Sequence, residues 1–235
     1  MIDILRDYGV LLLIGQYPGG PLGGLAMTLI IAATSLLISI PFAIAVGLAR
    51  VSPWRPVRLA AAAYVNTMRG LPLLLLVFWA YFFVPYLTGQ RVSGATTMIW
   101  SLVLYEGAFL GEIVRAGIQA IPKGQAEAAR ALGLSYPQMM ARIVLPQALF
   151  NMIPSLLSQF ILLVKDTSLA YIIGTPELTY AADQVNAQLM TRPFEVYAIL
   201  AGTYFILCYS LSRVANGLEK RIHVRRAARA AASQA

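Results

Sequence analysis

The sequence predicts an all-α membrane protein that crosses the bilayer with five transmembrane helices. Of the 235 residues, 59% are hydrophobic and only 12% are charged, which is about half the charged fraction of a soluble domain. Several stretches almost free of charge have the length of roughly 20 residues that a helix needs to cross the bilayer core. Most lysines and arginines flank these stretches. These observations exclude a soluble enzyme, a disordered tail and a disulfide-stabilised scaffold.

The first charge-free stretch is too long to form one helix. No charged residue lies between Tyr8 and Ala49, and the sequence QYPGGPLGG at 16–24 interrupts this stretch with proline and glycine. We therefore expect an external N-terminal segment over 1–24 that includes a short interfacial piece, and a first transmembrane helix over 25–49.

Prolines separate the first helix from the second, and a polar loop separates the second from the third. Pro53 and Pro56 force a turn because proline lacks a backbone N–H and fixes its own φ angle. A second helix over 59–86 follows and contains one charged residue, Arg69. The polar loop TGQRVSGATT then leads to a third helix over 96–114.

The second half of the chain alternates polar stretches with two further apolar helices. The first polar stretch is rich in alanine, and the C-terminal residues are basic. The expected elements are a cytoplasmic loop over 115–142, transmembrane helices over 143–164 and 196–213, an external stretch over 165–195, and a basic cytoplasmic tail over 216–235. The transmembrane domain as a whole is expected to cover 25–215.

The distribution of positive charge predicts the orientation in the membrane. Five helices place the two termini on opposite sides, and cytoplasmic loops carry an excess of Lys and Arg. One side holds 13 of the 18 cations, so this side faces the cytoplasm, with the C-terminus, and the N-terminus lies outside. Because these cations flank apolar helices, we expect contact with anionic membrane lipid and no nucleic-acid partner. They are Arg50, Arg55, Arg58, Arg115, Lys123, Arg130, Arg142, Arg213, Lys220, Arg221, Arg225, Arg226 and Arg229.

Residue counts and a missing motif limit the chemistry of the chain. The single cysteine, Cys208, and the single histidine, His223, exclude an intrachain disulfide and predict no metal site. The sequence contains no GxxxxGK[ST] phosphate-binding loop. We therefore expect that the chain is not an enzyme and does not itself hydrolyse ATP.

The cytoplasmic loop contains the signals of two short helices. Pro122 is suited to a helix start, and Gly133 to the left-handed position that ends a helix. Ser135, followed three residues later by Gln138, forms the capping box of a second helix. The two helices have small side chains and little hydrophobic surface, so they cannot form a core by themselves. We therefore expect them to dock against a partner.

Within this loop, seven residues match a known motif. Glu127, Ala128 and Ala129, then Gly133, then Ile143, Leu145 and Pro146 resemble the EAA loop of ABC importer permeases at every spacing. The wider stretches 111–178 and 63–85 are similar to the polar amino acid permease family. The resemblance covers the chain from about 25 to 215.

This resemblance implies a type I ABC importer permease in the bacterial inner membrane. In such importers the loop inserts as a coupling helix into a groove of a cytoplasmic ATPase subunit, which binds ATP and Mg, whereas the permease binds no cofactor. A second permease, identical or a sister chain, and an external solute-binding protein complete the transporter. The stretches AYVNTMR and WAYFFVP are most similar to the glutamate/aspartate branch, so these amino acids are the expected substrates.

The residues of the coupling motif suit this role, and a simpler interpretation competes with it. Ala128 and Ala129 let a helix seat closely in a groove, and Glu127 can accept a charge-assisted hydrogen bond from the partner. The alternative is an alanine-rich surface helix in which Glu127 pairs with Arg130. The complete spacing match favours coupling.

Arg69 is the first candidate for the substrate path, because an ionisable residue inside a transmembrane helix is costly. Gly70 and Pro72 are expected to interrupt the helix beside it, and a broken helix can direct a cation at an anionic ligand. The hypothesis is that Arg69 recognises a substrate carboxylate or holds a gate. The alternatives are that it sits nearer a helix end, reaches along the helix to the membrane surface, or pairs with Glu106 or Glu112.

Asp166 is the second candidate, at the external end of the fourth helix. Its carboxylate can bind the α-amino group of an amino acid, with Thr167 and Ser168 sharing this function. Alternatively, Asp166 caps the following helical turn or pairs with Lys165.

Two acids in the third helix have different expected roles. Glu112 is expected to pair with Arg115 at the cytoplasmic end. Glu106 lies deeper and is a further candidate for the substrate path, although a partner in a permease dimer explains it equally well. The external stretch 165–195 either docks a solute-binding protein or is an ordinary solvated loop.

Two functions from other classes remain as alternatives. An ion-coupled secondary transporter would use Glu106 or Asp166 as its coupling site. A membrane scaffold without transport activity predicts that substitutions of Arg69 and Asp166 leave all transport intact. The matched EAA loop favours the ABC permease over both.

Overall fold

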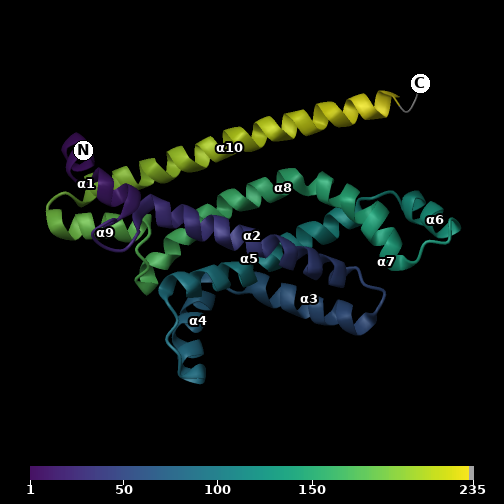
Figure 1. Cartoon of the computed structure of the whole chain (residues 1–235), viewed down its shortest axis with the longest axis horizontal. Coiled ribbons are helices and arrows are strands. Elements are labelled where there is room, and N and C mark those ends of the chain that lie inside the picture. Colours follow the sequence, from purple (N-terminus) through teal and green to yellow (C-terminus); the bar gives the residue numbers. More distant parts are fainter. Residues whose placement is uncertain (233–235) are drawn as a thin grey trace.

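The computed structural model describes the backbone of residues 1–232 and the side chains of residues 1–220, and this part of the chain is almost entirely helical (Figure 1). Apart from the helices it contains two isolated β-bridges. The elements are α1 (Ile2–Ile14), α2 (Gly24–Arg50), α3 (Arg55–Gly70), α4 (Leu73–Thr88), α5 (Gly94–Gln119), α6 (Lys123–Ala131), α7 (Tyr136–Met139), the π-helical turn η1 (Met140–Val144), α8 (Leu145–Asp166), the 3-10 segment η2 (Thr167–Ile173), α9 (Leu178–Leu189) and α10 (Pro193–Ala232).

Within the described residues, four helical stretches are long and apolar enough to cross a membrane, namely Gly24–Arg50, Gly94–Gln119, Tyr136–Ile173 and Pro193–Lys220. A fifth span exists if α3 and α4 are counted together. The predicted class of an all-α membrane protein is therefore confirmed.

Three helices extend beyond the intervals that hydrophobicity marks. α5 continues through the first residues of the expected loop over 115–142, α7 and η1 lead directly into α8, and α10 continues through the expected tail as far as Ala232. The last three residues of that tail, 233–235, and the side chain of His223 lie outside the described residues.

The expected helix over 59–86 consists of two helices joined by a sharp bend. α3 and α4 meet at 103°, which confirms the interruption predicted at Gly70 and Pro72. Pro72 biases the preceding residue away from helical geometry, and Leu71 adopts φ −100° and ψ 139°. Each helix has 16 residues and a length of about 24 Å, so neither crosses a 30 Å hydrocarbon core by itself when it lies along the membrane normal.

The core of the domain forms where α2 packs against α5 through small residues. A Cβ atom at Gly111 would lie 2.7 Å from Val46 Cγ1, and one at Gly47 or Gly107 would collide with Val114 or Phe42. Glycine at these positions lets the two helices approach closely.

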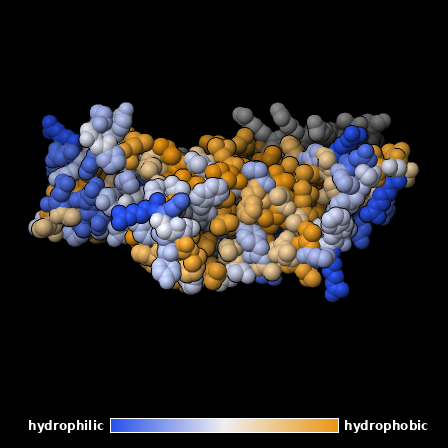
Figure 2. All heavy atoms as spheres, turned by 60° about the horizontal axis from the view of Figure 1, so that its bottom comes forward, coloured by the Kyte–Doolittle hydropathy of each residue, from blue (hydrophilic) through white to orange (hydrophobic). Residues whose placement is uncertain are grey.

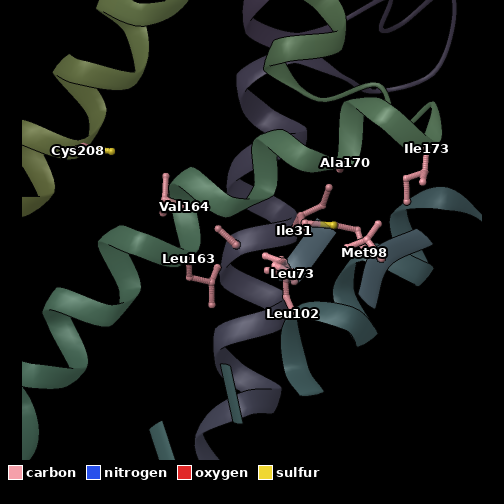
Figure 3. Packing of buried hydrophobic residues seen from close by; sticks show 11 residues of the cluster. Ile31, Leu73, Met98, Leu102, Leu163, Val164, Ala170, Ile173 and Cys208 are labelled. Atoms are coloured by element: carbon pink, nitrogen blue, oxygen red, sulfur yellow. The ribbon is translucent and has the colours of Figure 1, made fainter. Parts of the chain in front are cut away.

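A large cluster of buried apolar side chains joins the remaining helices to this pair. As Figure 3 shows, Ile31 of α2 lies close to Leu73 of α4 and to Met98 of α5. Leu163 of α8 belongs to the same buried cluster. The cluster thereby fixes α4 and α8 around the α2–α5 pair.

Polar residues lie at the two ends of the molecule. In Figure 1 the N-terminus and α9 lie at one end, and α6, α7 and the C-terminal end of α10 lie at the other. Figure 2 shows hydrophobic side chains gathered between two more hydrophilic ends. The coupling-loop residues and the substrate-path candidate Asp166 therefore occupy different levels of the molecule.

Candidate functional site

The two helices predicted in the cytoplasmic loop form as α6 and α7, which we call the coupling helices after the role that the sequence resemblance leads us to expect. Gly133 has φ +76°, and the N–H of Leu134 donates to the carbonyl of Ala129 at 3.1 Å, so a left-handed glycine ends α6. The N–H of Ser135 donates to Gln138 Oε1 at 2.9 Å, which is half of the predicted capping box. The local signals of both helices are confirmed.

The coupling helices have one inward and one outward face. Ala129 is buried against Met139, Met140 and Val144, so it holds α6 to its own subunit. Glu127 and Ala128 are exposed. The outward face therefore presents Glu127 and Ala128, with the large apolar side chain of Leu132 80% exposed just after the helix.

The simpler interpretation holds only in part. In the part of the chain whose side chains are described, Glu127 forms no ion pair with Arg130, although α6 is a surface helix ended by Gly133. The exposed Glu127 carboxylate is accessible to a partner.

Residues at the start of α8 connect the coupling helices to the membrane. Ile143 lies in the π-helical turn, and Leu145 and Pro146 begin α8 directly after it. Tyr136 at the start of α7 donates from its hydroxyl to the carbonyl of Val51 at 3.2 Å. The coupling helices are thus attached both to α8 and to the end of α2.

Arg69 lies at the end of α3, beside the break. Its side chain is exposed, and its guanidinium lies 5.5 Å from the centre of the Phe109 ring, which is a cation–π distance. The alternative pairing with Glu106 or Glu112 is wrong, because Arg69 forms no ion pair with either among the described side chains, whereas its position in the last turn of α3 fits the alternative of a site near a helix end.

Glu112 lies in an ion-pair cluster at the end of α5 near the coupling helices. It pairs with Arg115, as predicted, and with Arg50 at 3.3 Å. The second cation comes from α2, which sequence spacing does not reveal. The cluster ties the ends of α2 and α5 together.

Glu106 is fully buried in α5. Gln159 of α8 donates from Nε2 to Glu106 Oε2 at 2.9 Å, while Oε1 has no hydrogen-bond partner. The sequence analysis missed Gln159, although an amide inside an expected transmembrane helix signals a need for a polar partner. A buried carboxylate oxygen without a donor is a candidate contact for a ligand or a second subunit.

Asp166 is half-buried where α8 ends. Its side chain does not cap η2 and forms no ion pair with Lys165 among the described side chains, so both structural alternatives are wrong. Thr167 is buried and donates to the carbonyl of Val164 at 2.7 Å, whereas Ser168 is half-buried. Asp166 and Ser168 are therefore the more accessible polar groups of this turn.

An aromatic pair on α5 lies beside Arg69. The rings of Tyr105 and Phe109 are 5.0 Å apart. The Arg69 guanidinium lies over the Phe109 ring. The sequence analysis missed both aromatic residues, since only the fold brings the end of α3 beside α5.

Glu177 is a buried acid at the opposite end from the coupling helices, and the sequence analysis assigned it no role. It is fully buried and accepts from the N–H groups of Thr179 and Tyr180, each at 2.9 Å, and from the Tyr204 hydroxyl at 3.2 Å. Its neighbour Leu178 donates to Thr28 Oγ1 at 3.1 Å. Burial raises the pKa of Glu177 to about 7. This network attaches α9 to α2 and α10.

Within the described residues, no group of three or more His, Cys, Asp and Glu side chains has the arrangement of a metal site. Cys208 is buried and not in a disulfide. Candidate groups for binding chemistry among the described residues are therefore Arg69, Asp166, the Glu106 carboxylate and the outward face of α6.

Comparison with known proteins identifies the family. Residues 39–224 match the family described as binding-protein-dependent transport system inner membrane component. The chain is 41% identical over 200 residues to the probable glutamine ABC transporter permease GlnP of Bacillus subtilis, covering 84% of this chain and 91% of that protein. It is 36% identical over 208 residues to the glutamate/aspartate import permease GltK of Escherichia coli O6:H1, covering 85% and 92%.

A solved structure has the same fold. The chain superposes on a subunit from the crystal structure of an amino acid ABC transporter with histidines, with a TM-score of 0.77, 33% identity, and coverage of 84% and 92%. An inward-facing methionine transporter, MetNI, matches at a TM-score of 0.66 and 21% identity, which shows the fold alone. The chain therefore belongs to the family of binding-protein-dependent transport system inner membrane components, and it is a multi-pass inner-membrane permease of an amino acid ABC importer.

Proposed function

We propose that this permease moves polar amino acids, glutamate and aspartate first among them, into the cytoplasm by alternating access driven by a partner ATPase. It works with a second permease, identical or a sister chain, and receives substrate from an external solute-binding protein docked over α9. ATP and Mg bind to the ATPase subunit, and this chain binds no cofactor. The N-terminus lies outside and the coupling helices lie in the cytoplasm.

One observation carries this proposal. Arg69 and Asp166 lack ion-pair partners among the described side chains. The Arg69 guanidinium lies over Phe109, whose ring contacts that of Tyr105, and we infer that Asp166 lies on the other side of this pair. A cation and a carboxylate flanking an apolar surface complement the α-carboxylate and α-ammonium groups of an amino acid. This arrangement suits every amino acid zwitterion, and a second carboxylate on the substrate gives Arg69 a further favourable contact.

The broken helix supports the position of the path. A backbone break at membrane depth is tolerated only where it lines water or is covered by protein. The break between α3 and α4 directly follows Arg69. We therefore place the substrate path, or the contact with the second permease, at this break.

The coupling mechanism follows from the two faces of α6. The outward Glu127–Ala128 face inserts into a groove of the ATPase subunit, while buried Ala129 fixes α6 to its own domain. The helix continues from α7 through η1 into α8, so a movement of the coupling helices reaches the turn that carries Asp166. The two permeases then rotate between outward-open and inward-open states.

The test is ATP-dependent uptake in proteoliposomes that contain the permease, its ATPase subunit and its solute-binding protein. A panel of radiolabelled amino acids defines the substrate, and preferred uptake of an amino acid other than glutamate or aspartate would contradict the narrower assignment. We expect Arg69→Gln and Asp166→Asn to reduce uptake while the protein remains folded. Arg91→Gln and Asp7→Asn, which change exposed charges elsewhere, serve as matched controls.

The coupling role has its own variant. Glu127→Gln removes a charge-assisted hydrogen bond to the ATPase subunit, so we expect about tenfold to hundredfold weaker ATPase binding. Uptake that persists without the ATPase subunit and stops when the proton gradient collapses would instead establish a secondary transporter. Unchanged uptake in both the Arg69 and the Asp166 variants would contradict the proposed path.

A further inference from the structure

We propose that a cavity beside the coupling helices binds the phosphate headgroup of an anionic phospholipid from the cytoplasmic leaflet. The cavity has a volume of about 570 Å³ and is lined by residues from the α2–α3 junction, the end of α5, and helices α6 and α7. Neither Arg69 nor Asp166, which the proposed function assigns to the substrate, lines it.

Positive charge dominates the lining of this cavity. Arg50, Arg58 and Lys123 line it, and none of its lining residues is acidic. Arg50 shares the Glu112 carboxylate with Arg115, so one negative charge serves two cations. Arg58 and Lys123 form no ion pair with any of the described side chains. The cavity therefore has an excess of positive charge that an anion would neutralise.

The start of α6 adds a second feature that favours an anion. Pro122 and Lys123 lie on the cavity wall, and no side chain caps the first turn of α6. The unpaired N–H groups and the dipole at a helix N-terminus attract negative charge. The three cations and the start of α6 thus line the same cavity.

The remaining wall of the cavity is apolar. Ile118, Ile121, Met139, Met140 and Val144 line it and belong to, or pack on, one buried cluster. Contact with this wall stabilises a hydrocarbon chain, because burying apolar surface is favourable, but gives nothing to a hydrated inorganic anion. The lining therefore fits an anionic amphiphile.

The surroundings of the cavity favour a membrane lipid over a soluble partner. Trp54, just before α3, is 72% exposed, and Val57 and Leu59 beside Arg58 are also exposed apolar residues. Exposed tryptophan next to cations is typical of the membrane interface. The charge pattern places this level at the cytoplasmic surface, where anionic headgroups attract basic pockets between transmembrane helices.

A headgroup in this cavity would bridge Arg58 of α3 and Lys123 of α6. It would thereby brace the coupling helices against the transmembrane domain and make transport depend on anionic lipid. This functional consequence rests on the proposed coupling role, whereas lipid binding itself does not.

The test is native mass spectrometry of the purified full-length chain titrated with phosphatidylglycerol or phosphatidylcholine. We expect preferential binding of phosphatidylglycerol, weakened about fivefold by either Arg58→Gln or Lys123→Gln and about 25-fold by the double variant. Arg55→Gln and Arg142→Gln are the matched controls, because these exposed cations belong to the same group of basic residues but do not line the cavity. Binding within about twofold of wild type is expected for both controls.

Several results would overturn the proposal. Unchanged phosphatidylglycerol binding in the double variant, or equal binding of phosphatidylcholine, would show that the cavity does not select the lipid. Displacement of the lipid by inorganic phosphate at equal concentration would assign the cavity to a free anion. Loss of bound lipid when the ATPase subunit is added would assign it to the protein interface. Because lipid binding is measured without transport, failure of the Glu127 experiment leaves this result unaffected.

Discussion

Glu177 makes the stability of the end of the molecule around α9 depend on pH. Burial raises its pKa from the ordinary value of 4.5 to about 7, so the folded state binds the proton more tightly than the unfolded state does. The resulting stability is fully present below pH 4.5 and is lost as the pH rises through 7. At 1.36 kcal/mol per pKa unit, the difference between the two values corresponds to about 3 kcal/mol.

Substitution of Glu177 by glutamine isolates this effect. Glutamine cannot titrate, and its carbonyl oxygen can still accept a hydrogen bond from the N–H of Thr179 or Tyr180, so the fold is expected to survive. The measurement is the thermal midpoint of the purified protein in detergent, followed by intrinsic fluorescence between about pH 5 and pH 8. We expect the midpoint of the wild type to fall with rising pH more steeply than that of Glu177→Gln.

The control for this experiment is Glu127→Gln, which removes an exposed carboxylate at the other end of the molecule and should keep the slope of the wild type. Equal pH slopes in wild type and Glu177→Gln would refute the reasoning, because they would show that Glu177 titrates alike in the folded and unfolded states.

Two further predictions concern packing and ion pairs, and both are checked by thermal midpoints at constant pH. Gly47→Ala should destabilise the protein by about 1–3 kcal/mol, because its Cβ atom would collide with Val114. The control Gly124→Ala adds a Cβ atom in open space and should change stability by less than about 1 kcal/mol. Equal midpoints for the two variants would contradict the close α2–α5 packing. Glu112→Gln should cost about 2 kcal/mol, between the values of exposed and buried pairs, because two arginines lose their shared carboxylate; an unchanged midpoint would show that this cluster is not stabilising.

Local chemistry predicted the features of the fold that depend on a few adjacent residues. Gly70 and Pro72 marked the break between α3 and α4, Gly133 marked the end of α6, and Ser135 with Gln138 marked the start of α7. Each depends on a backbone preference or a side-chain hydrogen bond within four residues, which a single sequence contains directly.

Features that depend on distant residues or on the bilayer were not predictable in this way. Hydrophobicity marks the interval inside the membrane, so it does not show that α5 continues to Gln119. The donor to Glu106 comes from α8, and the aromatic ring under Arg69 comes from another helix, so neither partner follows from spacing along the chain. The structural alternatives for Asp166 were plausible from its neighbours and fail because its side chain neither caps η2 nor forms an ion pair with Lys165 among the described side chains.

The π-helical turn at Met140–Val144 has a consequence for how this chain can change in length. A π-helical turn accommodates one residue more than an α-helical turn without rotating the helices on either side. Deletion of one residue within it, such as Ala141, can therefore convert the turn to regular α-helix while α7 and α8 keep their relative orientation. An insertion elsewhere in α8 would instead rotate Asp166 by about 100° relative to the coupling helices. The turn is the place where evolution or design can adjust the chain length without changing the phase between the two ends.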